Sequence, residues 1–411
     1  MQNRLSTVAI VIVALIAVLY QFVFKSLLFD SLGYGRRTTN ISAFNVKCQK
    51  LQDPGLEACE DMWLHEPSGL LYLACSDSQH RPSWVPSLVH FNVSGRPMSD
   101  HIAVLDTRSD KPLKSRLQWL RVENFSGNNG DGTLNLHGID LREDTASGRL
   151  QLLAINHRPP LDPTTGAELD PKSIGANSTI ELFEIEMDSG KPAMKHIKTY
   201  ADKVIDTPNR VAWVGEDAFV FSNDASSKTG IRRAFDVFLG CGSVGYCNDH
   251  DCHKAYEKGF IFPNGLVHGR DGLIYVPSSV TGEVQVFSIT PKQHLKQVDS
   301  FQVPYPIDNL SVDRNGDIYA ATFPNLHKLL KSAEDPFKVN PASAVFKIRK
   351  VTETSEAEIR REGRYLVEKI MEDDGSVLPG STTALHDAEG GRIYLGGTFS
   401  PFVTVCELGQ D

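Results

Sequence analysis

Six short segments of this 411-residue chain resemble one another, and their recurrence constrains the fold more than any other feature. Each has a Gly, Asp or Glu turn, then a run of apolar or aromatic residues, then small or polar ones. A turn followed by such a run is typical of a β-strand. Recurrence at uneven spacings of about 45–80 residues is what a β-propeller with loop insertions gives. The segments are 69–76, 148–157, 216–224, 271–279, 315–323 and 390–398.

Six repeats predict an all-β fold, a six-bladed β-propeller. The 32 Gly and 22 Pro favour a turn-rich β protein over a helical bundle, and no second domain is apparent. Helical spacing appears over residues 355–374, although strands could share part of that segment. A net charge of −9 with no basic cluster argues against nucleic acid as a partner.

The N-terminus is strongly apolar. Residues 7–24 contain one strongly polar residue, Gln21, and are long enough for a marginal transmembrane helix. No small-x-small cleavage site follows, which favours an uncleaved signal-anchor at 1–25 over a cleaved signal peptide. We predict a juxtamembrane linker at 26–45 and the propeller at 46–411, with the membrane contacted through the N-terminal segment.

Glycosylation signals place the propeller in the secretory pathway. Positive charges on both sides of the apolar segment orient it only weakly, and taken alone they favour the opposite orientation. N-x-S/T sequons are useful only in the secretory lumen. We therefore predict a lumenal or extracellular propeller that is membrane-anchored, with secretion as the alternative. The predicted glycosylation sites are Asn40, Asn92, Asn124 and Asn177.

The seven cysteines fit the same compartment, because disulfides persist there. Three of them cluster with His250 and His253 within residues 241–253. A zinc site is conceivable, but the spacing matches no common ligand pattern, so a disulfide-stapled loop is favoured. An odd total leaves one thiol free or the pairing incomplete. The sequence leaves open the pairing of Cys59, Cys75, Cys241, Cys247 and Cys252.

Polar residues stand among apolar neighbours about eight to ten residues before four of the repeats. They are Glu60-Asp61, Asn209, Asn264 and Asp308-Asn309. Equivalent positions in successive blades point at the same place in a propeller. Carboxylate and amide oxygens are the ligands that Ca²⁺ takes, whereas zinc or copper would favour Cys or His. Any one of these residues alone could cap a turn, but four at one phase of a repeat favour a metal site.

Several short motifs in order along the chain give a family resemblance. They are CEDMWL, LNLHGIDL, LLAINH, PNRVAWVG, FPNGL, IDNLSVD, GSVLPGST and a terminal CEL. With these motifs the chain resembles the serum paraoxonase/arylesterase family, which is related to the gluconolactonase-like superfamily. The family comprises calcium-dependent six-bladed propeller hydrolases with lactonase and esterase activity. The resemblance covers nearly the whole soluble part and indicates chemistry better than it indicates a substrate.

Carried over by position, the resemblance implies roles for individual residues. His137 would transfer the proton with His157 as its partner, and a near-neutral imidazole suits general-base work on a water. Cys48 and Cys406 would form an end-to-end disulfide. The ligands of the catalytic calcium would be Glu60, Asn209, Asn264, Asp308 and Asn309.

One position departs from the family pattern. The resemblance implies a second calcium bound by Asp61 and the carbonyl of Ile139, but the third carboxylate position holds Arg210. Arg210 would instead pair with Asp61, so that a guanidinium replaces the charge of the metal. We therefore predict one tightly bound calcium rather than two.

The predicted function is calcium-dependent hydrolysis of lactones or aryl esters, small-molecule substrates. A water would be activated by His137, oriented by His157, or by Asp308. No G-x-S-x-G elbow is present, which disfavours a serine hydrolase. The alternatives are a metal-dependent isomerase or cyclase, or a non-catalytic propeller scaffold. The sequon at Asn309 is predicted to be silent, because a ligating Asn cannot carry a glycan.

Overall fold

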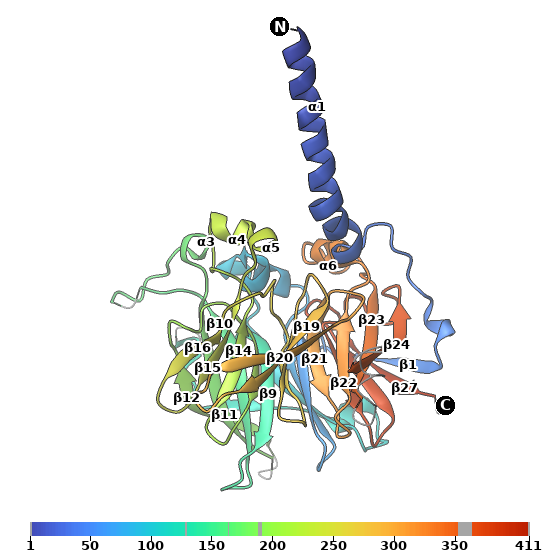
Figure 1. Ribbon diagram of the computed structural model, residues 1–411. Helices are drawn as coiled ribbons and strands as arrows, with labels where there is room; N and C mark the ends of the chain where they lie inside the picture. The colour runs from blue at the N-terminus through green and yellow to red at the C-terminus, as the bar shows by residue number, and fades with distance from the viewer. Residues whose placement is uncertain (1, 128–129, 163, 188–190, 352–363, 410–411) are drawn as a thin grey trace.

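The computed structural model describes residues 2–127, 130–162, 164–187, 191–351 and 364–409. Six sheets, each with at least four strands, are arranged around a central axis (Figure 1). The first strands of consecutive blades contact one another, and the sixth contacts the first, so the ring is closed. The predicted six-bladed β-propeller is therefore confirmed.

Each blade is an antiparallel meander, with a parallel edge strand, β8, added to the second blade. A short hairpin, β4–β5, lies outside the blades. In blade order the strands are β2 (Asp61–His65), β3 (Leu70–Cys75), β6 (His101–Asp106) and β7 (Leu117–Trp119); β9 (Leu136–Glu143), β10 (Leu150–Arg158), β11 (Asn177–Glu186), β12 (Ala193–Tyr200) and β8 (Arg121–Glu123); β13 (Pro208–Trp213), β14 (Phe219–Asn223), β15 (Ser243–Cys247) and β16 (Cys252–Tyr256); β17 (Val267–His268), β18 (Ile274–Pro277), β19 (Glu283–Ile289) and β20 (Leu295–Gln302); β21 (Ile307–Val312), β22 (Ile318–Thr322), β23 (Ser343–Lys350) and β24 (Tyr365–Asp373); β25 (Thr383–Asp387), β26 (Arg392–Gly396), β27 (Val403–Leu408) and β1 (Val46–Leu51); the hairpin is β4 (Trp84–Val85) and β5 (His90–Phe91).

The six similar segments form the second strands of the six blades: β3, β10, β14, β18, β22 and β26. The hairpin before β22 shows how the turn residues work. Gly316 takes a φ of +84°, and Asp313 accepts hydrogen bonds from the backbone N–H groups of Asn315 and Asp317. Aspartate and glycine at these positions form a tight turn, and the β-rich run after it becomes a strand.

The hydrophobic core lies between blades rather than in one central mass. A separate cluster of buried side chains fills the space between each pair of neighbouring blades. Between the second and third blades, for example, Leu153 and Ile155 pack with Phe219 and Phe221, all fully buried. Because the apolar residues face sideways into these clusters, polar residues are free to line the axis.

The sixth blade is closed by the N-terminal strand. β1 pairs with β27 in antiparallel register, and Cys48 lies opposite Cys406. The structure joins the two cysteines in a disulfide across a sequence separation of 358 residues. The end-to-end disulfide is therefore confirmed, and it ties the two ends of the propeller together.

Removing this disulfide should destabilise the protein. We expect Cys48→Ser/Cys406→Ser to lower the free energy of unfolding by about 2–5 kcal/mol, measured by urea denaturation, because a very long loop is released in the unfolded chain. Cys247→Ser/Cys252→Ser is the matched control, since that disulfide spans only 5 residues. An equal or larger effect of the control pair would contradict the clasp.

Most helices gather at one end of the propeller, together with the N-terminal helix (Figure 1). One helical stretch among the described residues, Ile10–Ser31, is long and apolar enough to cross a membrane, and its described side chains are exposed as far as Ser26. A signal sequence passes the same test, so membrane anchoring stays a prediction. The helices are α1 (Gln2–Leu19), η1 (Tyr20–Phe24), η2 (Ser26–Ser31), η3 (Ile41–Ala43), η4 (Arg81–Ser83), η5 (Pro86–Leu88), η6 (Val93–Gly95), α2 (Leu113–Arg116), α3 (Pro171–Ile174), α4 (Ile231–Ala234), α5 (Asp236–Leu239) and α6 (Leu326–Ser332).

The helical spacing over 355–374 does not produce a helix in the part that the structure describes. Tyr365–Asp373 forms β24, the outer strand of the fifth blade, and residues 352–363 lie outside the described residues. Pairing with β23 outweighs the local helical pattern here.

Candidate active site

Every blade contributes one polar residue to the floor of a cavity of about 600 Å³, either from its first strand or from the residues just before that strand. The cavity opens at the helix-bearing end of the propeller, where residues of α4, α5 and α6 line it. Thr382 is the contribution of the sixth blade, and the sequence analysis missed it. Its only signal was its position about eight residues before the sixth repeat. The six floor residues are Glu60, His137, Asn209, Asn264, Asp308 and Thr382.

Irregular pairing turns two of these residues toward the channel. The register of β13 with β14 shifts between Pro208 and Val211, and that of β21 with β22 shifts between Ile307 and Leu310. Asn209 and Asp308 lie inside these irregularities. A bulge re-aims the side chains it contains, which is why it is common beside active sites.

Two carboxylates share the floor. Burial raises the pKa of Glu60 to about 7, although the Arg81 cation and the Thr382 hydroxyl oppose the rise. Burial, together with the charge of Glu60, raises the pKa of Asp308 well above its usual value. Two acids this close cannot both ionise cheaply without a cation between them. The pair is therefore suited to a positive ligand.

Two amide oxygens on the same floor have no partner. Asn209 Oδ1 and Asn264 Oδ1 are buried and accept no hydrogen bond from any residue that the structure describes. Their amide nitrogens are engaged, since Asn264 Nδ2 donates to Ser279 Oγ at 2.6 Å and Asn209 Nδ2 lies 3.3 Å from His137 Nε2. A buried acceptor left unpaired costs free energy. Together with the carboxylates, these oxygens fit a hard cation such as calcium.

Asn309 has a different position from its neighbour Asp308. It is buried, and its Nδ2 donates to the backbone oxygen of Glu60 at 3.3 Å, but it does not line the cavity. Its role as a ligand stays a prediction. A side chain with 2% exposure has no room for a glycan, which agrees with a silent sequon.

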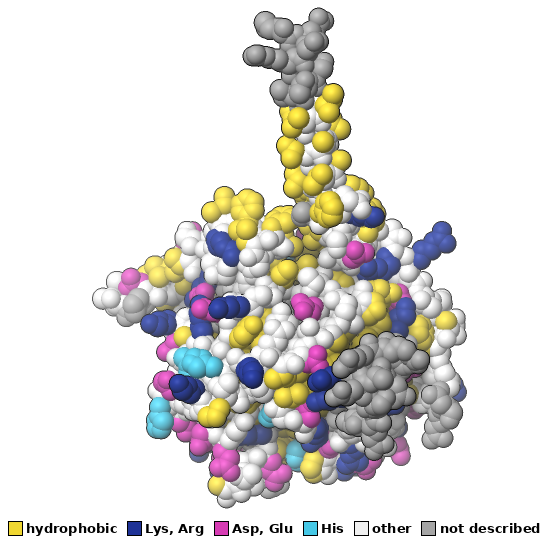
Figure 2. Space-filling model, viewed as in Figure 1, with side chains coloured by type: hydrophobic (Ala, Val, Ile, Leu, Met, Phe, Trp, Pro, Cys, Tyr) yellow, Lys and Arg dark blue, Asp and Glu magenta, His cyan; other side chains and the backbone are white. Residues whose placement is uncertain are grey.

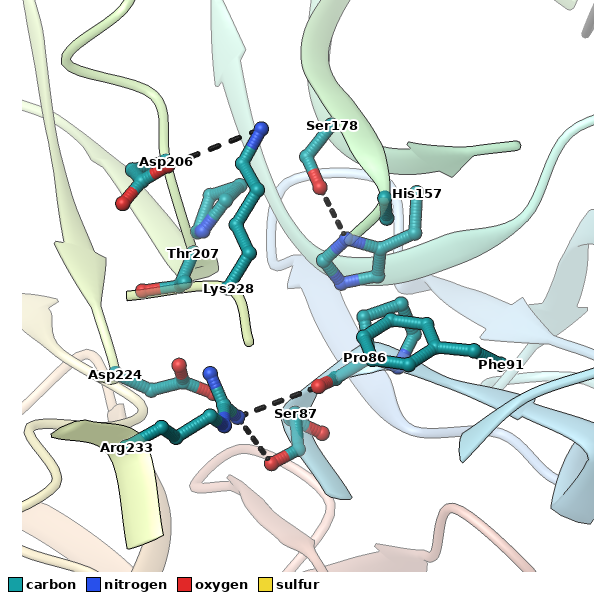
Figure 3. A pocket seen from close by; sticks show the side chains of 12 residues that line it. Pro86, Ser87, Phe91, His157, Ser178, Asp206, Thr207, Asp224, Lys228 and Arg233 are labelled. Carbon is teal, nitrogen blue, oxygen red and sulfur yellow. Dashed lines mark hydrogen bonds and ion pairs between the residues drawn. The ribbon is translucent and has the colours of Figure 1, made fainter. Parts of the chain in front are cut away.

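His137 and His157 lie against each other beside the floor. His157 Nε2 is 3.3 Å from His137 Nδ1. His157 Nδ1 is 2.8 Å from Ser178 Oγ, and Figure 3 draws this second bond. His137 Nε2 lies 3.7 Å from Glu60 Oε1. The predicted His137–His157 pair is thus brought together, with Ser178 behind it and the carboxylate in front.

The pKa values of both rings differ from the near-neutral value expected from the sequence. Burial lowers the pKa of His137 well below its usual value, with the charges of His157 and Arg81 adding to the effect. Burial and Arg81 lower the pKa of His157 to about 3. Both rings are therefore neutral at pH 7.

The sequence analysis also missed a support beneath the histidines. Arg81 Nη1 donates to the carbonyl of Leu136, the residue before His137, at 2.7 Å. Trp84 Nε1 donates to the carbonyl of His157 at 2.8 Å. Both side chains are almost fully buried. Residues 81–84, which comprise η4 and the first residue of β4, therefore hold the backbone of both histidine strands.

Asp224 and Arg233 connect the floor with the helices above it. Arg233, from α4, donates to the carbonyls of Ser87 and Pro86 (Figure 3) and lowers the pKa of Asp224, which burial raises to about 6. The Asn209 amide also opposes this rise in the pKa of Asp224. Asp224 therefore lies close to the amide end of Asn209.

Behind the floor, Arg210 occupies the place of the second calcium that the family resemblance implies. Arg210 Nε lies 2.7 Å from Asp61 Oδ2 and donates to the carbonyl of Ile139 at 3.3 Å. Asp61 also accepts hydrogen bonds from the backbone N–H groups of Ile139 and Met62. The predicted Arg210–Asp61 pair is confirmed. The residues present do not fit a second cation, because the Arg210 guanidinium already pairs with the two groups that would bind it, the Asp61 carboxylate and the Ile139 carbonyl.

The remaining predicted sites have clear places. Cys247 pairs with Cys252, so the disulfide-stapled loop is confirmed and zinc at residues 241–253 is wrong; Cys59 pairs with Cys75, and Cys241 is free and buried. No three His, Cys, Asp or Glu side chains of the described residues form a metal cluster, so a cation would rely on amide oxygens. The four predicted sequon asparagines are all exposed: Asn40, Asn92, Asn124 and Asn177.

Comparison with known proteins decides the family. The sequence profile of the Arylesterase family matches residues 172–408, more than half of the chain. The chain belongs to the arylesterase family. Family membership places it among ester-hydrolysing enzymes and agrees with the resemblance found in the sequence.

Curated relatives of this arylesterase-family chain match over most of their length. Serum paraoxonase/arylesterase 1 of Homo sapiens is 26% identical over 281 residues, 67% of this chain and 69% of that protein. Serum paraoxonase/arylesterase 2 of Rattus norvegicus is 26% identical over 315 residues, 75% and 76% of the two chains. Among solved structures, a gluconolactonase from Xanthomonas campestris has a TM-score of 0.46 and 16% identity, with 93% of this chain and 92% of that chain covered.

Proposed function

We propose that this enzyme is a calcium-dependent hydrolase of lactones or aryl esters. The observation that carries the proposal is the floor itself: two buried carboxylates beside two amide oxygens that have no partner. Glu60, Asp308, Asn209 and Asn264 would hold the ion, and all of them offer hard oxygen atoms. A bound calcium ion would polarise an ester carbonyl and offset the charge that develops on its oxygen.

His137 would act as the general base on the attacking water. Its Nε2 faces Glu60, while its Nδ1 lies beside His157 Nε2. With the proton of His137 on Nδ1, Nε2 carries the lone pair and accepts from Asn209 Nδ2 at 3.3 Å. A water that replaces this contact would give its proton to Nε2, and the imidazolium that forms would be stabilised by the Glu60 carboxylate. His157 fixes this tautomer through its own bond to Ser178.

Asp308 is the second candidate for this role. It lines the same cavity as His137, so either side chain could reach a water above the floor.

Three disulfides indicate an oxidising compartment, and we propose that the enzyme functions as a glycoprotein in the secretory pathway, anchored through its N-terminal helix. The exposed sequons and the apolar helical stretch Ile10–Ser31, whose first part is exposed, support this.

The direct test is an assay of the full-length chain on a panel of aryl esters and lactones, with calcium and after chelation. We expect hydrolysis that chelation abolishes and added calcium restores, since the two floor carboxylates then lose their counter-charge. Metal content is measured on the same samples. Undiminished turnover in a sample shown to be free of metal would overturn the calcium proposal.

A further inference from the structure

The cavity above the catalytic floor has one wall that comes from outside the propeller. Leu27, Ser31 and Leu32 line it together with residues of α4, α5 and α6. Leu27 and Ser31 belong to η2, the last helical turn of the N-terminal segment, and Leu32 is its C-cap. All three lie at the start of the segment predicted to be the linker. Figure 2 shows apolar side chains gathered around the base of this helix. We call the three lining residues Leu27, Ser31 and Leu32 the N-terminal wall.

The N-terminal wall is fixed to the propeller by specific contacts. Its last carbonyl, that of Leu32, accepts from the backbone N–H of His327 and lies 2.8 Å from His327 Nδ1. Just beyond it, the carbonyl of Gly33 accepts from Asn325 Nδ2 at 2.8 Å. Tyr34 stacks on the His327 ring at 4.2 Å. The wall is therefore held on the residues around the start of α6.

Gly33 makes this close approach possible. Its φ is +68°, and a Cβ at this position would lie 2.1 Å from the carbonyl oxygen of Pro324. Any larger residue would push the segment away. On the other side of the cavity, Phe24 packs against Phe238 of α5 with ring centroids 6.2 Å apart. The segment thus reaches from α5 to α6, the helices on both sides of the cavity.

The chemistry of this wall is apolar. Leu32 packs with Phe323, Leu326 and Leu329, and the last three also line the cavity. Charged groups are confined to the floor and to Arg233 and Asp224 near α4. A substrate that places its ester on the floor would therefore direct an apolar substituent along the wall.

We propose that the N-terminal wall is a substrate-binding surface that selects esters and lactones with an apolar chain long enough to reach Leu27 and Leu32. The inference rests on the proposed hydrolase function, which supplies the class of reacting group. It also requires that the N-terminal segment stays on the mature chain. Each methylene buried on the wall should raise kcat/KM about four-fold.

The test compares full-length variants in phosphatidylcholine nanodiscs on lactones of increasing alkyl length. We expect Leu27→Ala to lower kcat/KM for the longest alkyl lactone by about ten-fold or more, while the unsubstituted lactone changes less than about two-fold. Gly33→Ala should give the same pattern without altering a lining side chain. Leu28→Ala is the matched control, because Leu28 is half-buried in the same segment but does not line the cavity.

A binding measurement separates this proposal from the proposed function. Non-hydrolysable alkyl lactams should displace the neutral dye Nile red from the wild type with affinity that rises with chain length, and this rise should flatten in Leu27→Ala and Gly33→Ala. If no ester is turned over but the lactam series behaves so, the wall stands and the hydrolase proposal fails. A chain-length dependence equal in all variants, or a mature chain that mass spectrometry shows to begin beyond residue 32, overturns the wall.

Discussion

Glu60→Gln should lower kcat by about 10²–10³-fold at saturating calcium, because it removes one of the two charges that would hold the ion and stabilise the charge developing on the substrate. The change is nearly isosteric. A glutamine oxygen can still accept from Thr382 Oγ1, which lies 3.0 Å from Glu60 Oε2. The loss should therefore reflect charge and not shape, and steady-state kinetics with a calcium titration measures it.

The same substitution should have the opposite effect on stability once metal is removed. In chelator the Glu60 carboxyl has a pKa raised from 4.5 to about 7 by burial. The folded protein therefore binds this proton more tightly than the unfolded chain does. The protonated carboxyl stabilises the folded protein fully below pH 4.5, and this stabilisation is lost as pH rises to about 7. We expect Glu60→Gln to remove that loss and unfold at higher urea than the wild type at pH 7.5 in chelator, but at lower urea in calcium.

Glu66→Gln is the control for this experiment. Glu66 follows the far end of the same strand, β2, where it pairs with Arg270 and Arg314 at the other end of the channel. It should change neither kcat nor the calcium dependence of stability. If Glu60→Gln destabilised the protein equally with and without calcium, Glu60 would be a structural carboxylate and the proposed ion site would be wrong.

The sequence predicted the blade strands well because their signal is local. A turn such as Asp313–Asp317 and the apolar run after it can be predicted from a few neighbouring residues. The same pattern occurs once in each of the six blades. The phase of Glu60, Asn209, Asn264 and Asp308 was readable for the same reason, since each precedes its second strand by a similar distance. Thr382 escaped because a lone threonine before a strand has no chemical signature.

Contacts between distant segments could not be predicted in this way. Arg81 and Trp84 look like surface loop residues in the sequence, yet both are buried under the histidine strands. The residues that form the N-terminal wall were predicted to be part of a linker at 26–45. Their contact with the propeller could not be predicted, because Gly33 and Asn325 meet only in the folded chain. The low pKa of His137 likewise depends on burial, which a motif does not reveal.

Arg210 is the exception, where one substitution against a family pattern predicted a long-range contact. A buried acid that loses its metal needs another cation, and the neighbouring position supplies a guanidinium. Asp61 and Arg210 are 0% and 3% exposed, and their atoms lie 2.7 Å apart. The pair stands between the catalytic floor and the second cavity at the opposite end of the channel, which Arg210 also lines.

Arg210→Met should therefore lower the free energy of unfolding by about 3–5 kcal/mol, because it leaves the buried Asp61 carboxyl without the cation that pairs with it. Asp61→Asn/Arg210→Met should recover most of that loss, since no charge is left behind. Urea denaturation of the wild type, both single variants and the double variant gives the coupling energy, which we expect at about 2–3 kcal/mol. Additive effects would show that the two side chains are merely neighbours.

Metal analysis of the same four proteins completes the argument. If Arg210 takes the place of an ion, the wild type should bind one calcium tightly, and Arg210→Met should not change the occupancy of the catalytic floor. Two tight equivalents in the wild type would mean that the guanidinium and a second cation share Asp61. The guanidinium and a second calcium ion are both positive, and Asp61 has only one carboxylate, so the ion could bind there only if Arg210 moved away from Asp61. The coupling energy between Arg210 and Asp61 would then fall as calcium is added.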